Sequence, residues 1–284
     1  MAIAKTSDIS SDLGLVNRKV FQRQGVLRQY GSANGWLEAG ETAAVLSVAE
    51  AARGAPILDL GVGGGRTAPL LSGISADYHG IDYAPAMVRL ARNRFPTLDF
   101  REMDARRMDF HDGTFALALF SYNGIDSVDI AGRRAIMREV YRVLRPGGSF
   151  VFSTLNRLGA AFPPRWPNWR VFRGTEPMRP LRLLRATAKL LVGGFNQLRA
   201  SHRSRDYGES AIGSLDAHNF ALVAVFTSPS ETLRQLHEAG FHVQAMFDPL
   251  GLLLSVDDRL ETTAPWYYVV ARKGVAECED PSGR

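Results

Sequence analysis

A short glycine-rich segment carries the clearest chemical signal in the sequence. Asp59 ends an apolar run, and glycines follow at positions 61, 63, 64 and 65. Glycine adopts positive φ angles and has no Cβ, so such a backbone can approach a ligand closely. We therefore predict a ligand site at this turn, with the Asp59 carboxylate beside whatever binds there.

The spacing of the glycines separates two kinds of nucleotide-type ligand. A dinucleotide site has the pattern G-x-G-x-x-G, whose third glycine lets a helix pack closely on a strand. Counted from Gly61, that third position is Arg66, so the dinucleotide pattern fails. The segment reads D-x-G-x-G-x-G instead. Either pattern is a weak signal alone, because glycine-rich turns also serve as structural corners.

Two further acidic residues end predicted strands. Asp82 ends the strand 78–81 and Asp104 ends the strand 98–103. Asp82 follows the glycine turn by about 20 residues, the offset at which an acid meets ribose hydroxyls. Open α/β sheets bind ligands at the carboxyl ends of their strands. One such Asp is often a helix N-cap, but acids at three successive strand ends indicate a ligand.

A parallel sheet is needed to bring these acids together. Strand and helix patterns alternate with short loops from residue 57 to residue 154, which predicts a parallel sheet covered by helices on both faces. The predicted strands are 57–60, 78–81, 98–103, 115–120, 149–154, 241–247 and 266–271. The predicted helices are 12–30, 41–52, 66–71, 84–95, 131–144, 180–199 and 230–239.

Four segments together form a specific combination: Ile57-Leu-Asp-Leu-Gly-Val-Gly-Gly-Gly65, Gly80-Ile-Asp-Tyr-Ala-Pro-Ala-Met87, Met103-Asp-Ala105 and Val140-Tyr-Arg-Val-Leu-Arg-Pro-Gly-Gly148. Through them the sequence resembles the class I S-adenosylmethionine-dependent methyltransferases, strongly over 55–156 and weakly over 229–272. The resemblance implies an α/β fold with a Rossmann-like seven-stranded, mostly parallel sheet whose last strand runs antiparallel. It also implies S-adenosylmethionine as the cofactor.

The resemblance assigns the cofactor-binding residues from one end of the donor to the other. The glycine turn and Asp59 meet the amino-acid end, and Asp82 accepts hydrogen bonds from both ribose hydroxyls. Tyr83 and Met87 flank the adenine. Asp104 and Ala105 meet the adenine edge, and Ser121 meets the methionine portion. The full set is Asp59, Gly61, Gly63, Gly65, Asp82, Tyr83, Met87, Asp104, Ala105 and Ser121. Two positions depart from the usual family pattern: we expect Gly64 to loosen the turn and Arg66 to face outward.

The residues that bind the molecule receiving the methyl group, the acceptor, are less well defined by the sequence. Methyl transfer needs mainly alignment and exclusion of water, although a hydroxyl acceptor usually needs a general base. Our catalytic candidates are His218, Asn123 and Tyr122; Asn123 equally suits a helix cap, and His218 a packing role. The segment 122–126 is not the Asn/Asp-Pro-Pro-Tyr motif of enzymes that methylate DNA or glutamine amines. No His/Cys cluster has metal-ligand spacing, so we expect no metal.

An Arg-rich segment interrupts the α/β pattern. Residues 157–207 carry eleven basic and two acidic residues, whereas the net charge of the whole chain is +5. The helix predicted at 180–199 has an apolar face, and Trp166, Trp169 and Phe172 precede it. Three interpretations stay open: a lid helix packed on the core, a surface for an anionic substrate or lipid headgroups, and an RNA contact. No recognisable RNA-binding module accompanies it, so nucleic acid is not favoured.

The chain is expected to comprise an N-terminal helical cap (1–54), a Rossmann-like core (55–156 and 223–273), a basic helical lid insertion (157–222) and a flexible tail (274–284). No apolar run approaches the roughly 18 residues of a spanning helix. The N-terminus lacks a secretory signal, and the single Cys278 excludes an internal disulfide. We therefore expect a cytoplasmic protein without a transmembrane segment, although surface contact with a membrane stays possible.

Together these features predict an S-adenosylmethionine-dependent methyltransferase that acts on the oxygen or nitrogen of a small-molecule acceptor, anionic or lipid-like. Two alternatives remain. One is an RNA methyltransferase that uses the Arg-rich insertion, and the other is a non-catalytic subunit that binds the donor and serves a partner. The sequence does not define the acceptor or the oligomeric state.

Overall fold

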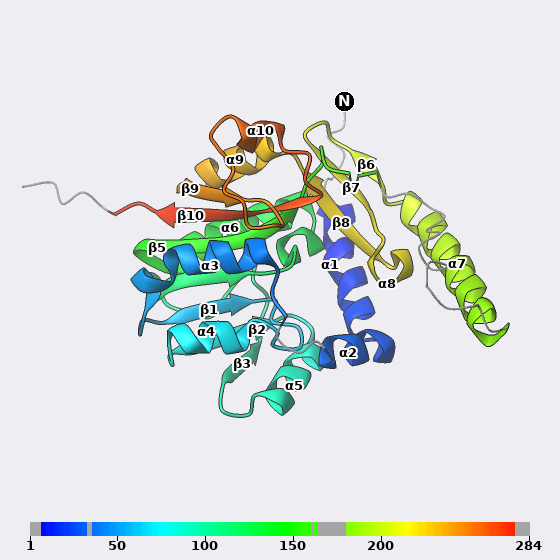
Figure 1. Ribbon diagram of the computed structural model, residues 1–284, viewed down its shortest axis with the longest axis horizontal. Coiled ribbons are helices and arrows are strands. Elements are labelled where there is room, and N and C mark those ends of the chain that lie inside the picture. Colours follow the sequence, from blue (N-terminus) through cyan, green and yellow to red (C-terminus); the bar gives the residue numbers. More distant parts are fainter. Residues whose placement is uncertain (1–6, 33–35, 161, 164–179, 276–284) are drawn as a thin grey trace, which may run out of the picture.

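A seven-stranded sheet forms the centre of the molecule (Figure 1). The computed structural model describes residues 7–32, 36–160, 162–163 and 180–275. The strand order is β3-β2-β1-β4-β5-β10-β9, and β10 runs antiparallel to both of its neighbours. The strands are β1 (Ile57–Leu60), β2 (Tyr78–Asp82), β3 (Asp99–Glu102), β4 (Phe115–Phe120), β5 (Leu144–Leu155), β9 (Phe241–Phe247) and β10 (Trp266–Lys273). The predicted α/β fold and its antiparallel last strand are confirmed.

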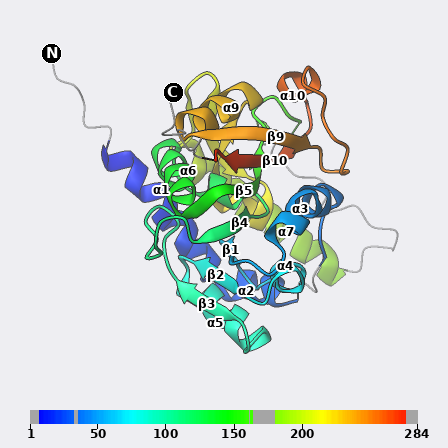
Figure 2. The same cartoon turned by 90° about the vertical axis from the view of Figure 1, so that its left-hand side faces the viewer.

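Helices cover both faces of this sheet, as predicted. Figure 2 shows α3 and α6 on opposite sides of it. The helices around the sheet are α3 (Ala39–Ala52), α4 (Ala68–Ile74) and α5 (Pro85–Arg94), which share one apolar cluster, and α6 (Ile130–Val143) and α9 (Pro229–Glu238), which share another. Because both faces are covered, β4 is buried at every position and reads as a continuous apolar run.

Local sequence signals account for where several of these helices begin. The Asp129 carboxylate accepts a hydrogen bond from the backbone N–H of Gly132 and caps α6. Ser228 caps α9 in the same way through the N–H of Glu231, and Pro229 occupies the first helical position. These caps fix the residues at which α6 and α9 begin.

The insertion contains a small sheet as well as a helix. Strands β6 (Arg205–Asp206), β7 (Ser210–Leu215) and β8 (Leu222–Thr227) form an antiparallel three-stranded sheet, and the short α8 (Ala217–Phe220) joins the last two. We expected the Rossmann-like core to resume at residue 223. Instead β8 pairs with β7, so the chain returns to the large sheet only with α9.

The N-terminal helices lie against this small sheet. The predicted helix 12–30 is two helices, α1 (Ser7–Phe21) and α2 (Gln24–Gly31), because Arg23 adopts an extended conformation between them. The bend lets Val20 and Val26 both become buried. The buried Asn17 side chain donates to the carbonyls of Ser127 and Val223, at 2.8 and 2.7 Å. Asn17 thereby ties α1 to the loop after β4 and to the small sheet.

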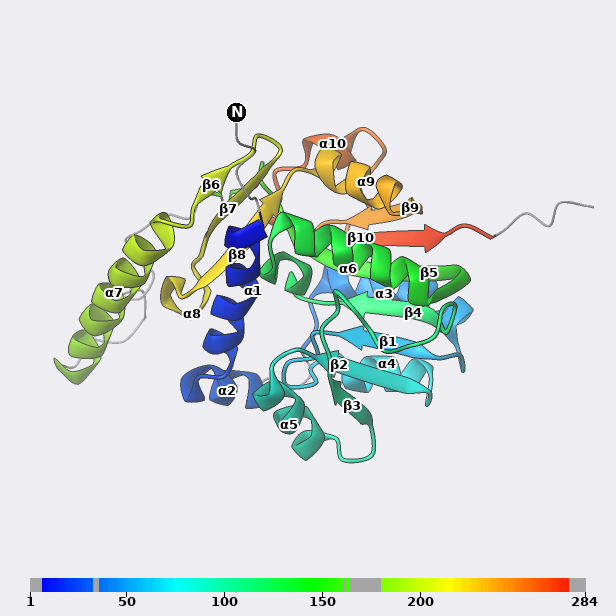
Figure 3. The same ribbon diagram turned by 180° about the vertical axis from the view of Figure 1, so that it is seen from behind.

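The helix predicted at 180–199 is confirmed as α7 (Pro180–Ser201). It stands away from the large sheet, on the side of the sheet's carboxyl edge, in both Figure 1 and Figure 3. Trp166, Trp169, Phe172 and Cys278 lie outside the described residues. None of the helices that the structure describes is long and apolar enough to cross a membrane.

A buried ion pair joins the loop after β4 to α6. The Arg133 guanidinium and the Asp126 carboxylate contact each other, and both side chains are completely buried. Arg133 also donates to Thr154 Oγ1 and to Gln235 Oε1, at 2.8 and 2.9 Å, and the Leu155 N–H donates to Asp126 at 2.7 Å. Asp126 therefore holds together α6, the end of β5 and the loop after β4.

Replacing one partner of this pair should destabilise the fold. In Arg133→Met, the buried Asp126 carboxylate loses its counter-charge, which typically costs about 3–5 kcal/mol. Urea unfolding followed by circular dichroism measures the change in the free energy of unfolding. The matched control is Arg138→Met on the exposed side of the same helix, where we expect a change within about 0.5 kcal/mol. Equal effects of the two substitutions would contradict a stabilising role for the pair.

Candidate functional site

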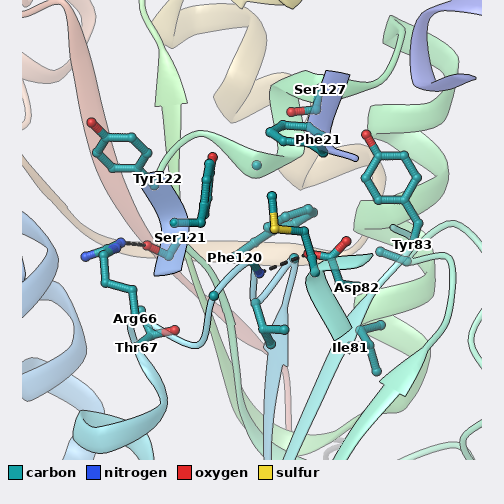
Figure 4. A pocket seen from close by; sticks show the side chains of 18 of the residues that line it. Phe21, Arg66, Thr67, Ile81, Asp82, Tyr83, Phe120, Ser121, Tyr122 and Ser127 are labelled. Atoms are coloured by element: carbon teal, nitrogen blue, oxygen red, sulfur yellow. Dashed lines mark hydrogen bonds between the residues drawn. The ribbon is translucent and has the colours of Figure 1, made fainter. Parts of the chain in front are cut away.

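A cavity of about 450 Å³ opens at the carboxyl ends of β1, β2 and β4, within the usual range of small-ligand sites, roughly 300–1,000 Å³. Figure 4 shows the side chains that line it. The lining comes from both N-terminal helices, from the loops after the first four parallel strands and from α8. The lining residues include those at 61–64, 81–83, 103–105, 120–122 and 217–218.

The glycine turn forms part of the cavity wall. Gly61 and Gly63 adopt positive φ angles of 62° and 54°. A Cβ on Gly61 would lie 2.6 Å from the Phe120 ring, and one on Gly63 would lie 2.9 Å from the Tyr30 ring. Gly64 was expected to loosen the turn. That expectation was wrong, because a Cβ there would lie 2.5 Å from the carbonyl oxygen of Tyr30, so Gly64 permits close packing of α2.

The Asp82 carboxylate lies at the floor of the cavity and holds the glycine turn. One of its oxygens accepts from the Gly63 N–H at 2.9 Å, and the other accepts from the Ala84 N–H at 2.8 Å. Burial raises the pKa of Asp82 to about 6, against the lowering effect of these two bonds. Asp82 therefore remains an ionised acceptor at neutral pH.

Asp59 lies beneath the turn and does not line the cavity. Its Oδ2 accepts from Thr67 Oγ1 at 2.6 Å and from the Tyr78 hydroxyl at 2.8 Å. Its Oδ1 has no hydrogen-bond partner among the described residues, and burial raises its pKa to about 7. We expected Asp59 and Gly65 beside the ligand, but neither is among the lining residues: Asp59 lies beneath the turn, and Gly65 packs against the Phe95 ring, 2.9 Å from where its Cβ would be.

Arg66 points into the structure, which corrects the expectation that it faces outward. Its guanidinium forms a bidentate ion pair with Glu41 at 2.6 and 2.8 Å, and the Glu41 side chain is completely buried. Arg66 also donates to Ser121 Oγ, which in turn donates to Glu41. The rings of Trp36 and Tyr122 lie 4.8 and 5.4 Å from the guanidinium carbon. Ser121 thus lines the cavity at a fixed position.

The residues predicted at the adenine end come together on one side of the cavity. Tyr83, Met87, Asp104 and Ala105 all line it. The Arg106 guanidinium donates to the Asp104 carboxylate at 2.6 Å. Burial opposes ionisation of Asp104, but the bonds from Arg106 outweigh it and lower the pKa of that carboxyl.

Two of the three catalytic candidates line the same cavity. His218 and Tyr122 face it, and the His218 ring stacks on Tyr30 with centroids 6.1 Å apart. Burial, and then the nearby Arg23, lower the pKa of His218. Asn123 does not line the cavity; its backbone N–H donates to Ser153 Oγ at 2.7 Å. Tyr122 and Asn123 both have positive φ, a conformation that is uncommon outside glycine.

The sequence did not reveal that the N-terminal helices cover the cavity. Phe21, Tyr30 and Trp36 line it, and Glu41 anchors Arg66. The helical spacing of 12–30 indicated which residues face inward, but it carried no information on which part of the sheet they cover. Within the described part of the chain, no cluster of His, Cys, Asp and Glu could hold a metal ion.

Comparison with known sequences identifies the central domain. A methyltransferase domain model matches residues 57–148. A phthiotriol/phenolphthiotriol dimycocerosates methyltransferase of Mycobacterium tuberculosis is 32% identical over 160 residues, which are 54% of each chain. A demethylmenaquinone methyltransferase of Chlorobaculum parvum is 34% identical over 100 residues, 35% of this chain and 40% of the relative. The chain therefore spans about half, or less, of the length of these relatives.

Solved structures share the fold. A Mesorhizobium loti S-adenosylmethionine-dependent methyltransferase is 23% identical with a TM-score of 0.52, over 81% of this chain and 98% of that one. The Burkholderia thailandensis 1,6-didemethyltoxoflavin-N1-methyltransferase, solved with S-adenosylhomocysteine, is 14% identical with a TM-score of 0.55. The match covers 93% of this chain and 90% of that one. Residues 57–148 thus match a methyltransferase domain, and the chain shares the fold of class I S-adenosylmethionine-dependent methyltransferases.

Proposed function

We propose that this protein transfers a methyl group from S-adenosylmethionine to an oxygen or nitrogen of a small-molecule acceptor, mainly by aligning the two. The observation that carries the proposal is that a single cavity combines two regions of different chemistry. One is built on Asp82 and Asp104, and the other on Tyr30, Tyr122 and His218. A donor and an acceptor can therefore meet without water between them.

The donor end of the cavity fits a ribose. A carboxylate offers roughly four lone-pair sites, and Asp82 uses two of them for the Gly63 and Ala84 N–H groups. The remaining two can accept from a pair of vicinal hydroxyls. Because Asp82 is only 6% exposed, water competes little for these sites. The same carboxylate thus holds the turn and orients the ribose.

The adenine and methionine ends lie on either side of Asp82. Tyr83 and Met87 provide an apolar flank for the adenine, and the Asp104 carboxylate, held ionised by Arg106, accepts from its amino group. On the other side, Ser121 and the backbone of Gly61 approach the amino-acid end. The four hydrogens on the terminal nitrogens of Arg66 are taken up by Trp36, Glu41 and Ser121, so Arg66 acts by positioning Ser121.

The acceptor half can orient an aromatic or apolar molecule and receive its proton. When bound, the donor would supply a methyl carbon activated by a sulfonium; an acceptor atom would bond to this carbon in line as the carbon–sulfur bond breaks, which leaves S-adenosylhomocysteine. His218 is neutral at pH 7 because its pKa is lowered, so its imidazole can take the proton of a hydroxyl acceptor. The αL backbone at Tyr122 and Asn123 directs the Tyr122 ring toward Trp36, at 5.5 Å between centroids. Tyr122 therefore orients the acceptor, with Asn123 supporting its position.

A transfer assay distinguishes this function from the two alternatives. The protein is mixed with S-adenosylmethionine carrying a labelled methyl group, and with either total RNA or a small-molecule extract. We expect the label in the small-molecule fraction. Label in RNA would favour an RNA methyltransferase instead, and donor binding without turnover on any fraction would favour a non-catalytic subunit.

Removing the Asp82 carboxylate should weaken donor binding. Asp82→Ala removes the acceptor of both ribose hydroxyls, and charge-assisted hydrogen bonds of about 1.5–3 kcal/mol each predict a loss of at least tenfold. Calorimetric titration with S-adenosylhomocysteine measures the affinity. Asp77→Ala is the matched control, because Asp77 is exposed and comes just before the first residue of the same strand, whereas Asp82 is its last residue. If Asp82→Ala bound S-adenosylhomocysteine with unchanged affinity, the proposed position of the donor ribose at Asp82 would be ruled out.

The role of His218 can be tested through the pH dependence of turnover. If its imidazole takes the acceptor proton, kcat stays constant at neutral pH and falls in acid, below the ordinary His pKa of about 6.5, as the ring becomes protonated. His218→Gln should lower kcat about 100-fold and abolish this acid limb, while the affinity for S-adenosylhomocysteine changes little. A variant that keeps both the rate and the acid limb would show that His218 only packs on Tyr30.

A further inference from the structure

Helix α7 carries its large apolar side chains on the outside. Among the side chains of α7 that the structure describes, from 186 to 201, the buried residues are small; Ala186 and Ala200 are 5% and 4% exposed. Four large apolar side chains in this part of the helix are exposed instead; they are Leu191 (75%), Val192 (51%), Phe195 (60%) and Leu198 (69%). This arrangement contradicts the lid interpretation, in which the apolar face packs on the core.

These exposed side chains form one continuous stripe. Leu191, Phe195 and Leu198 are spaced by four and three residues, so they lie on the same side of the helix. Single exposed apolar residues are common on protein surfaces and need no explanation. Three large ones in register on a helix that projects from the body (Figures 1 and 3) indicate an apolar environment outside the protein.

A basic groove runs beside this stripe. A hollow of about 270 Å³ lies between α1 and α7, and its lining includes Lys19, Arg23 and Arg199 but no Asp or Glu of the described chain. Arg199 links the two features, since its guanidinium carbon lies 5.5 Å from the centroid of the Phe195 ring. The groove therefore offers positive charge directly next to the apolar stripe.

We propose that α7 attaches this protein to the surface of a bilayer that contains anionic lipids. The stripe of Leu191, Phe195 and Leu198 enters the boundary between headgroups and acyl chains, and the groove binds anionic headgroups. An amphipathic helix with cations flanking a bulky apolar face binds membranes in this way. RNA could bind the basic side chains of the groove, but it would leave Leu191 and Leu198 of the stripe exposed to water. A second copy of the chain would cover the stripe but bring two basic grooves close together.

Vesicle co-sedimentation tests this proposal with the 284-residue chain. We expect binding to vesicles of phosphatidylcholine mixed with phosphatidylglycerol, little binding to phosphatidylcholine alone, and weaker binding as salt is added. The double variant Phe195→Gln with Leu198→Gln, and separately Arg199→Glu, should each lower the affinity at least tenfold. All three residues are exposed, so circular dichroism should show an unchanged fold.

Matched controls separate the helix from a general effect of charge or hydrophobicity. Leu46→Gln on α3 and Arg138→Glu on α6 replace exposed residues of the same types elsewhere, and they should leave vesicle binding unchanged. The proposal is overturned if the wild type does not bind the mixed vesicles, or if the α7 variants bind as well as the wild type. It is also overturned if sedimentation velocity shows a dimer that the double variant dissociates, or if the protein binds RNA in place of vesicles.

Discussion

The hydrogen bond from the Gly63 N–H to the Asp82 carboxylate is the contact on which the rest of the site depends. It joins the turn after β1 to the end of the neighbouring strand β2, and so fixes the glycine backbone against the acid. Because the turn passes over Asp59, that second acid becomes buried and supports the turn from below through Thr67 and Tyr78. The two acids thus fix the turn from different sides: Asp82 lines the cavity, and Asp59 lies buried beneath the turn.

A second network connects this turn to the N-terminal part of the chain. Arg66 lies one residue beyond the last glycine, and its pair with Glu41 ties α3 to the turn and to Ser121 at the end of β4. The rings of Trp36 and Tyr122 cover the same guanidinium. Since α1 and α2 also close over the cavity, the shape of the site depends on segments far from the glycine motif in sequence.

The sequence predicted the large sheet and most of the cavity because both follow from local patterns. Alternating apolar strands and amphipathic helices allow few topologies, and acids at strand ends meet at one edge by geometry alone. Eight of the ten cofactor residues that the family resemblance implied line the cavity. The predictions failed where contacts between distant segments decide the outcome. No local pattern shows that Arg66 turns inward to Glu41, that α1 packs on β8 through Asn17, or that α7 exposes Leu191 and Leu198.

The central claim is that Asp82 receives the ribose of the methyl donor inside this cavity. A crystal structure of the complex with S-adenosylhomocysteine tests it most directly. The account predicts both ribose hydroxyls within about 2.5–3.2 Å of the Asp82 carboxylate oxygens, the adenine between Tyr83 and Met87, and the sulfur directed toward Tyr122 and His218. A ribose bound elsewhere, with Asp82 contacting only Gly63 and Ala84, would contradict it.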